Sequence, residues 1–266
     1  MFRHIPDWLF YGVVLASIYI GALLVNKNVE APPPPSELGP LLPSESPRDE
    51  QVLTQIDIPR SGTGTAFAID DDGSWLTARH VVDGCTEVAL KVGRNRVIPA
   101  KAEVYLKHDL AKLTTKWSRP PLPHDVNSQR RVGESGFFIG FPQGRPGEVV
   151  GNLISRSRML VRGRYSSDES VLAWAEIGRT NGLRGPLSGL SGAPVLDRDG
   201  EIIGVVSAEN PRRGRIYTVA PRALLPFFSD PSGEAEPLNT ESYGLQADQL
   251  RRARRIAQVF CLVEQP

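Results

Sequence analysis

The chain has 266 residues, with 31 basic and 30 acidic side chains and a net charge of +1, so it carries no global signal for nucleic-acid binding. This length can bury one large core or two small ones, and 25 glycines and 23 prolines favour a turn-rich β protein over a helical one. Only four histidines and two cysteines occur, without a Cys-x-x-Cys or His-x-x-x-His spacing. The sequence therefore predicts no metal site and no cofactor.

The N-terminal region contains an uncharged run of 18 residues, 8–25. As a helix at 1.5 Å per residue this run spans roughly 27 Å, close to a hydrocarbon core of about 30 Å. Trp8 and Tyr11 lie where interfacial aromatic side chains are expected. A cleaved signal peptide is the alternative, but the run is longer than a typical h-region and no Ala-x-Ala-like site follows closely. We therefore expect a retained transmembrane anchor within residues 1–28, with an orientation that the flanking charges leave open.

Residues 29–55 form a predicted linker. Seven prolines fall between residues 31 and 50, and such a composition stiffens the chain toward polyproline II without folding it. We expect a spacer that holds the following domain away from the membrane. A ligand for a proline-reading domain is the alternative.

From about residue 60 the sequence changes to short strands separated by turns. Val88, Leu90 and Val92 alternate with polar residues, the period of a half-buried strand. A proline-containing connector, 117–131, separates two groups of predicted strands without intervening helices, which indicates an all-β protein of two small antiparallel barrels. The first group is 63–69, 74–78, 87–92, 96–106 and 109–115, and the second is 135–139, 148–155, 171–177, 193–196, 201–207 and 216–219.

The last segment, residues 229–266, reads as a polar connector followed by a helix. Leu250, Ala253, Ala257 and Phe260 recur at helical spacing. The arginines between them mostly fall on the opposite side. We interpret that side as a solvated helix face rather than a lipid or nucleic-acid patch.

Three short blocks contain residue types that hydrolytic enzymes use together. Ser191 lies in Gly-Leu-Ser-Gly, His80 in Leu-Thr-Ala-Arg-His-Val-Val, and Asp109 in His-Asp-Leu-Ala. A serine hydroxyl is a weak nucleophile that needs a neighbouring base. An imidazole titrates near neutrality and can take and return a proton in one cycle, and a carboxylate on its other nitrogen fixes the tautomer and stabilises the imidazolium.

In the order His, Asp, Ser, these blocks resemble the trypsin-like serine proteases, most of all the bacterial high-temperature-requirement (Deg) type, over roughly residues 60–228. The resemblance implies a protease domain, 56–228, whose active site lies between two barrels, with His80 and Asp109 in the first and Ser191 in the second. It assigns the oxyanion hole to the backbone N–H groups of Gly189 and Ser191. We expect no PDZ module, which the Deg type usually carries.

His108 is a competing base because it adjoins Asp109. Adjacent residues on a strand point to opposite faces. If Asp109 faces the cleft, His108 is therefore expected to face away from it.

The resemblance also assigns the substrate pocket. Gly185, six residues before the serine, stands at the pocket base, and the strand that contains Ser207 and Glu209 stands at its wall. That strand is expected to pair with the substrate peptide as an added strand. Glu209, where many relatives have glycine, either narrows the pocket or attracts a basic side chain. We expect a small or aliphatic side chain at P1.

Cys85 and Cys261 are a possible disulfide. In the trypsin-like family a terminal helix commonly folds back against the first barrel, which would bring these two positions together. Two unrelated buried thiols are the alternative.

These observations predict a membrane-tethered serine endopeptidase that acts on polypeptides, in a single-pass protein of the bacterial inner membrane with its protease domain outside the cytoplasm. Two alternatives stay open: a catalytically silent relative that binds peptides in its cleft, and a structural protein of the cell envelope. The sequence gives neither the physiological substrate nor the oligomeric state.

Overall fold

The computed structural model describes residues 11–17, 19–20, 38–180, 182–228, 237–238 and 243–264. Residues 11–17 and 19–20 are helical, and the rest of the predicted anchor, 8–25, lies outside the described residues. Within the described ranges, no helix combines the length and the apolar character needed to cross a membrane.

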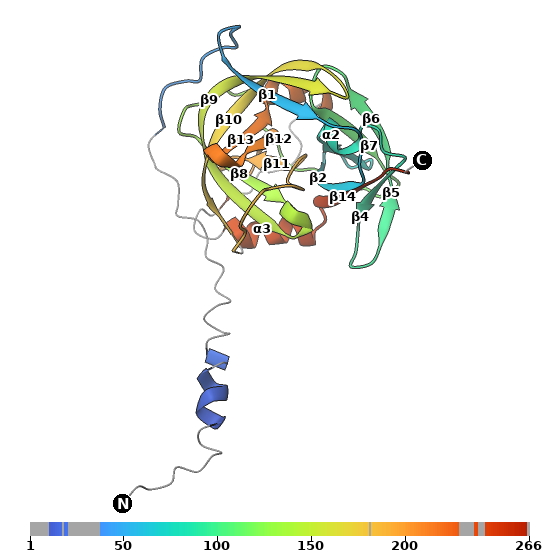
Figure 1. Ribbon diagram of the computed structural model, residues 1–266, viewed down its shortest axis with the longest axis vertical. Helices are drawn as coiled ribbons and strands as arrows, with labels where there is room; N and C mark the ends of the chain where they lie inside the picture. The colour runs from blue at the N-terminus through green and yellow to red at the C-terminus, as the bar shows by residue number, and fades with distance from the viewer. Residues whose placement is uncertain are drawn as a thin grey trace, which may run out of the picture.

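The fold is mostly β, as predicted, and consists of two seven-stranded sheets that lie side by side in Figure 1. In the first sheet the strands follow the order β5-β4-β14-β2-β3-β7-β6. Their bounds are β2 Gly62–Ala68, β3 Ser74–Thr77, β4 Glu87–Lys91, β5 Val97–Pro99, β6 Lys101–Tyr105, β7 Leu110–Thr114 and β14 Ile256–Leu262.

The second sheet follows the order β1-β9-β10-β13-β12-β11-β8. Its strands are β1 Glu50–Ile56, β8 Ser135–Gly140, β9 Gly147–Gly163, β10 Ser167–Arg179, β11 Pro194–Leu196, β12 Ile202–Asn210 and β13 Arg215–Val219. The helices are short: α2 Arg79–Val82, α3 Tyr243–Arg252 and the 3₁₀ turns η1 Pro142–Gly144, η2 Pro211–Arg213 and η3 Pro221–Phe227.

The largest hydrophobic core lies between the two sheets. Phe67 and Leu76 from the first sheet pack in one cluster with Phe137 and Ile139 from the second, and all four are fully buried. Tyr243 of α3 joins the same cluster. Because both sheets bury one face here, their relative position is fixed by apolar contact, and loops from both sheets meet at the edges of this core.

The prediction of an unfolded linker over residues 29–55 is wrong for its C-terminal part. Residues 29–37 lie outside the described residues, but 38–56 are docked on the second sheet. Gly39 and Leu42 donate backbone hydrogen bonds to Val132 and Arg130, and β1 pairs in parallel with β9 from Glu50↔Ser157 to Ile56↔Gly163. The prolines at positions 40, 43 and 47 precede the strand and do not interrupt it.

The predicted C-terminal helix is also wrong beyond residue 252. Arg254 takes a left-handed conformation, with φ of 59°, which ends the helical path. The following residues form β14 between β2 and β4. Residues 256–260 contain Ile, Val and Phe, which are strand-forming types, and their burial on both sides of the sheet gave an apolar pattern that also satisfied helical spacing.

Candidate active site

The first sheet brings His80 and Asp109 together at the ends of two paired strands. His80 lies in the short helix α2 directly after β3, and Asp109 directly precedes β7. β3 and β7 pair in an antiparallel register that joins Thr77 to Ala111. The His80 Nδ1 atom is 2.7 Å from Asp109 Oδ2, and the His80 backbone N–H donates to Oδ1 at 2.9 Å.

Asp109 is buried, with 2% of its surface exposed, and residues from the second sheet complete its hydrogen bonding. Ser207 Oγ on β12 donates to Oδ2. The hydroxyl of Tyr165, between β9 and β10, donates to Oδ1 at 3.3 Å. The carboxylate therefore accepts four hydrogen bonds from three residues, which satisfies a buried charge.

The charges of His80 and Asp109 stabilise each other. Burial of the imidazole acts to lower the pKa of His80, but the carboxylate of Asp109 and its hydrogen bond raise it further, and the net pKa lies above the ordinary value. Burial acts to raise the pKa of Asp109, but His80 and the hydrogen bonds from His80 and Ser207 outweigh it, so the net pKa is lowered. At neutral pH Asp109 is a carboxylate poised beside the ring.

Ser191 lies on a tight turn before β11, and the glycine after it fixes that turn against the first sheet. Gly192 has φ of 81°, and a Cβ atom there would lie 2.2 Å from Thr77 Oγ1 and 2.3 Å from the Thr65 carbonyl. Only glycine fits this approach. The Ser191 carbonyl accepts the Thr65 backbone N–H at 2.9 Å, so the serine turn is bound to β2 and lies against Thr77 of β3, the strand that leads into α2.

The Ser191 hydroxyl itself forms no hydrogen bond to His80 or to any other described residue. Ser191 is partly exposed, and 23% of the His80 side chain is accessible. Hydrogen bonds between a nucleophile and its base are often long without substrate and tighten when it binds.

Two backbone N–H groups next to Ser191 are free of acceptors among the described residues, those of Gly189 and of Ser191 itself. The Ser188 carbonyl accepts the N–H of Gln143, and a trans peptide then directs the Gly189 N–H the opposite way. Gly189 has φ of 94°, and a Cβ atom there would lie 2.6 Å from the Phe141 carbonyl. The two predicted oxyanion donors are thus available on the serine turn.

Thr65 organises this turn, and sequence reasoning missed it. Its Oγ1 donates to the Gly189 carbonyl at 2.8 Å and accepts the Phe141 N–H at 3.2 Å. Its own carbonyl accepts the hydroxyl of Thr77 at 2.7 Å. Thr65 is fully buried and is 124 residues from Gly189 in sequence, so no local pattern points to it.

The predicted pocket residues fall into two groups. Glu209 Oε1 accepts the backbone N–H of Leu187 at 2.8 Å, so its carboxylate crosses from β12 to the segment that carries Gly185. The Gly185 carbonyl is bound by Arg179. Ser207, in contrast, directs its side chain at Asp109.

His108 faces away from the imidazole of His80. Its Nδ1 atom is 3.2 Å from Glu169 Oε2, while Glu169 Oε1 accepts the backbone N–H of Asp109 at 3.0 Å. Sequence reasoning missed Glu169 and Tyr165, because both reach Asp109 from the other sheet.

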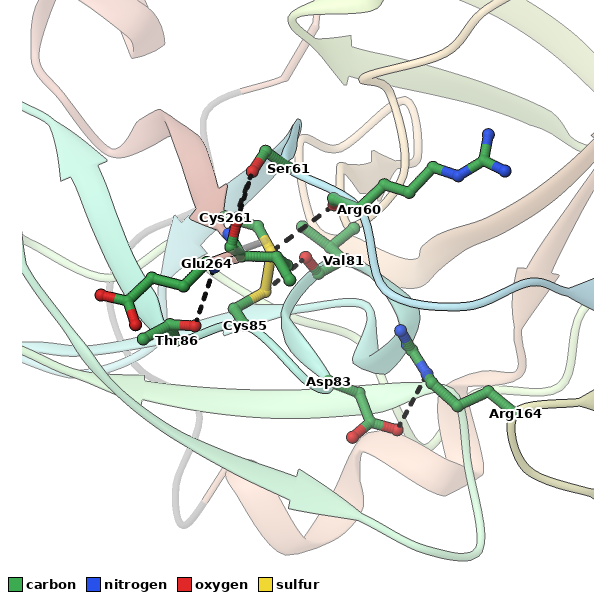
Figure 2. The surroundings of a disulfide bond; sticks show 10 residues. Arg60, Ser61, Val81, Asp83, Cys85, Thr86, Arg164, Cys261 and Glu264 are labelled. Carbon is green, nitrogen blue, oxygen red and sulfur yellow. Dashed lines mark hydrogen bonds and ion pairs between the residues drawn. A yellow bond between two sulfur atoms is a disulfide. The ribbon is translucent and has the colours of Figure 1, made fainter. Parts of the chain in front are cut away.

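Cys85 and Cys261 form a disulfide with a Cα–Cα distance of 5.4 Å. Figure 2 shows the bond beside Val81, the neighbour of His80, with Ser61 and Thr86 contacting the residues that follow β14. The pairing expected from the resemblance is therefore present, but the partner of Cys85 lies on β14 and not on a helix.

One group of carboxylates, Asp125, Asp197 and Glu201, brings oxygens within 4.8 Å of one another. The buried guanidinium of Arg130 forms ion pairs with Asp125 and Asp197. Arg130 offsets part of the negative charge of the cluster, which lies outside the His80 site.

Known proteins resemble this chain over the region that contains the candidate site. A family model described as a trypsin-like peptidase domain matches residues 64–205. The putative serine protease HhoB of Synechocystis is 30% identical over 162 residues, covering 60% of this chain and 37% of that protein. A probable periplasmic serine endoprotease DegP-like of Hahella chejuensis is 30% identical over 160 residues, covering 59% and 32% respectively. The chain thus spans about a third of the length of these curated relatives.

Among solved structures, the Rv3671c protease of M. tuberculosis in its active form is similar, with a TM-score of 0.52 and 20% identity. The match covers 66% of this chain and 76% of that one, and at this identity it concerns the fold alone. The region matched by the family model includes His80, Asp109 and Ser191 and covers more than half of the sequence. The chain therefore belongs to the trypsin-like peptidase family.

Proposed function

We propose that the protein is a serine endopeptidase in which Ser191 is the nucleophile, His80 the general base and Asp109 the residue that orients it. The observation that carries this proposal is the buried Asp109 carboxylate, which holds His80 through both its ring and its backbone. The proposed site lies where the two sheets meet, because Ser207 of β12 in the second sheet donates to Asp109, which directly precedes β7 of the first.

The reaction follows from the positions of these groups. His80 Nε2 takes the proton of Ser191 as Oγ forms a bond to the carbonyl carbon of the scissile peptide, while Asp109 stabilises the imidazolium. The imidazolium then returns this proton to the leaving amine, and the C–N bond breaks to give an acyl-enzyme. A water molecule, deprotonated by His80, attacks the ester carbonyl, and Ser191 leaves with its proton restored.

The free N–H groups of Gly189 and Ser191 supply the oxyanion hole in this proposal. Both donors are preset by the turn that Thr65 supports, so they need no rearrangement as negative charge develops on the substrate oxygen. Losing one such donor typically costs about 10²–10³ in kcat.

The substrate pocket is proposed to take a small or aliphatic P1 side chain. Glu209 Oε1 on β12 accepts the backbone N–H of Leu187, and burial raises the pKa of the Glu209 carboxyl. One carboxylate oxygen of Glu209 already accepts a backbone N–H. We therefore expect Glu209 to narrow the pocket rather than to pair with a Lys or Arg side chain of the substrate.

We also propose that the protein is tethered to the inner membrane with its peptidase domain outside the cytoplasm. The uncharged run at 8–25 supports the tether, and the Cys85–Cys261 disulfide supports an oxidising compartment. In permeabilised cells, added protease should digest the domain, and carbonate washing should leave it in the membrane pellet. If the domain is fully protected from the added protease, it lies on the cytoplasmic side. If carbonate releases the protein from the membrane pellet, the protein has no transmembrane tether.

Labelling by a fluorophosphonate probe tests the enzymatic proposal. Wild-type protein should be labelled and should hydrolyse peptides, Ser191→Ala should do neither, and Ser118→Ala, which alters an exposed serine outside the site, should match the wild type. Equal labelling of the wild type and Ser191→Ala rejects the nucleophile. No labelling of folded wild-type protein supports the silent, peptide-binding alternative.

A further inference from the structure

The acid of the proposed triad is held from the opposite sheet by one hairpin. Asp109 directly precedes β7 of the first sheet, whereas Tyr165 and Glu169 belong to the β9–β10 hairpin of the second. The Tyr165 hydroxyl donates to Asp109 Oδ1 at 3.3 Å, and Glu169 Oε1 accepts the Asp109 backbone N–H at 3.0 Å. Both contacts join residues more than 50 positions apart.

Each of these side chains is itself fixed. The guanidinium of Arg79, next to His80, lies 3.7 Å above the centre of the Tyr165 ring, a cation–π contact that sets the ring plane. The Glu169 side chain is fully buried and paired with His108. The hairpin therefore presents a rigid hydroxyl and a rigid carboxylate to one residue.

Burying Glu169 beside Asp109 is unfavourable by itself. Burial raises the pKa of Glu169, and the negative charge of Asp109 adds to that effect. Two like charges at close range in a buried site destabilise the fold unless their contacts compensate. Those contacts are made to Asp109 and to its neighbour His108, so the arrangement specifies the position of the triad acid.

We propose that Tyr165 and Glu169 are positioning residues that hold Asp109 in the orientation His80 requires. Tyr165 fixes the carboxylate by occupying Oδ1, and Glu169 fixes the backbone by its bond to the amide. This inference rests on the proposed peptidase activity.

Glu169 and Tyr165 are expected to shift the pKa of His80 in opposite directions. The groups that surround the His80–Asp109 pair are Arg79 and Asp83 of the α2 segment, His108 beside Asp109, Ser207 of β12, and Arg164, Tyr165 and Glu169 of the hairpin. Glu169 favours the imidazolium, so Glu169→Gln should move the acid limb of the kcat/KM profile to lower pH. The Tyr165 hydroxyl withdraws charge from Asp109, so Tyr165→Phe should move that limb to higher pH.

The test compares Tyr165→Phe and Glu169→Gln with two matched controls, Tyr105→Phe and Glu148→Gln. Tyr105 and Glu148 lie outside the site, and Glu148 is an equally buried carboxylate of β9. Peptide hydrolysis is measured across pH, with thermal unfolding and the fluorophosphonate labelling rate of each variant. We expect Tyr165→Phe to lower kcat about tenfold with KM unchanged, with opposite limb shifts for the two hairpin variants and none for the controls.

Two outcomes overturn the inference. Unshifted acid limbs in both hairpin variants, with activity falling only in proportion to the folded fraction, assign the hairpin a purely structural role. If Tyr165→Phe and Glu169→Gln both keep the wild-type kcat and pH profile, neither residue positions Asp109. Because labelling of wild-type protein is recorded in the same series, failure of the peptidase proposal is recognised separately.

Discussion

The ionisation of His80 links the geometry around Asp109 to a measurable pH. Burial lowers the pKa of His80, but Asp109 raises it beyond that loss, so the net value exceeds the ordinary 6.5. Proton abstraction needs neutral imidazole, and activity is therefore lost as pH falls through this raised pKa. We expect the acid limb of kcat/KM to have its midpoint above 6.5. A midpoint at or below 6.5 contradicts the conclusion that Asp109 raises the pKa of His80 by more than burial lowers it.

Ser191, His80 and Asp109 should behave as one unit. We expect Ser191→Ala and His80→Ala each to lower kcat by a factor on the order of 10⁶, and the double variant to be little worse than either. Asp109→Asn should cost about 10⁴ because it leaves the imidazole in the wrong tautomer. Steady-state and single-turnover hydrolysis measure these effects, and additive losses contradict a shared mechanism.

His108 provides the contrasting case at the residue scale. Its ring contacts Glu169 and not His80, so His108→Ala should change kcat only a few-fold. A loss as large as that of Asp109→Asn contradicts the conclusion that His108 faces away from the site.

Thr65 tests whether the oxyanion turn depends on the first sheet. Thr65→Val keeps the volume but removes the hydroxyl that bonds the Gly189 carbonyl and the Phe141 N–H. We expect kcat to fall about tenfold to a hundredfold with little change in KM, because a transition-state interaction is weakened. Thr63→Val, on an exposed position of β2, is the control. Equal rates in the two variants contradict the role of Thr65.

The residues of the site divide by how far their contacts reach along the chain. His80, Asp109 and Ser191 could be proposed from the sequence because three short blocks occur together in the order His, Asp, Ser, whereas one block alone is weak evidence. Thr65, Tyr165 and Glu169 were not, because their partners lie 124, 56 and 60 residues away. Such contacts depend on how two sheets pack, which periodicity within one strand does not encode.

At the scale of elements, β1 supports the hairpin that reaches Asp109. Val52 and Ile56 pack beneath it with Met159 and Val161. We expect the pair Val52→Ser and Ile56→Ser to lower the free energy of unfolding by about 2 kcal/mol and to reduce kcat. Leu53→Ser, at a position 71% exposed on the same strand, should change neither. Chemical denaturation and hydrolysis assays measure both quantities.

The elements also show where periodicity fails. Most strands of both sheets were predicted from short strand-like segments between turns, but β14 was read as helix because its buried residues satisfy both periods. β1 was missed because proline-rich sequence precedes it and because its outer face is exposed. In each case a neighbouring strand decides the structure: β2 and β4 for β14, and β9 for β1.

At the scale of the whole molecule, the disulfide joins residues 176 positions apart. The chain-entropy model assigns a loop of this length about 5 kcal/mol of stabilisation. We expect a reductant to lower the unfolding temperature of the wild type, and Cys85→Ser with Cys261→Ser to unfold at the reduced temperature with or without reductant. An unchanged wild type in reductant, with the thiols shown by mass spectrometry to be free, contradicts this expectation.

The position of β14 has a consequence for biosynthesis. β14 is the only link in the sheet order between β4–β5 and the strands β2, β3, β7 and β6 within the described part of the chain. A nascent chain that has not yet emerged past Leu262 has synthesised the proposed nucleophile, base and acid, but lacks the strand that joins the two parts of the first sheet. We therefore expect the first sheet to become complete only after β14 has been synthesised. Fragments that end before Ile256 should therefore hydrolyse peptides far more slowly than a chain that includes β14.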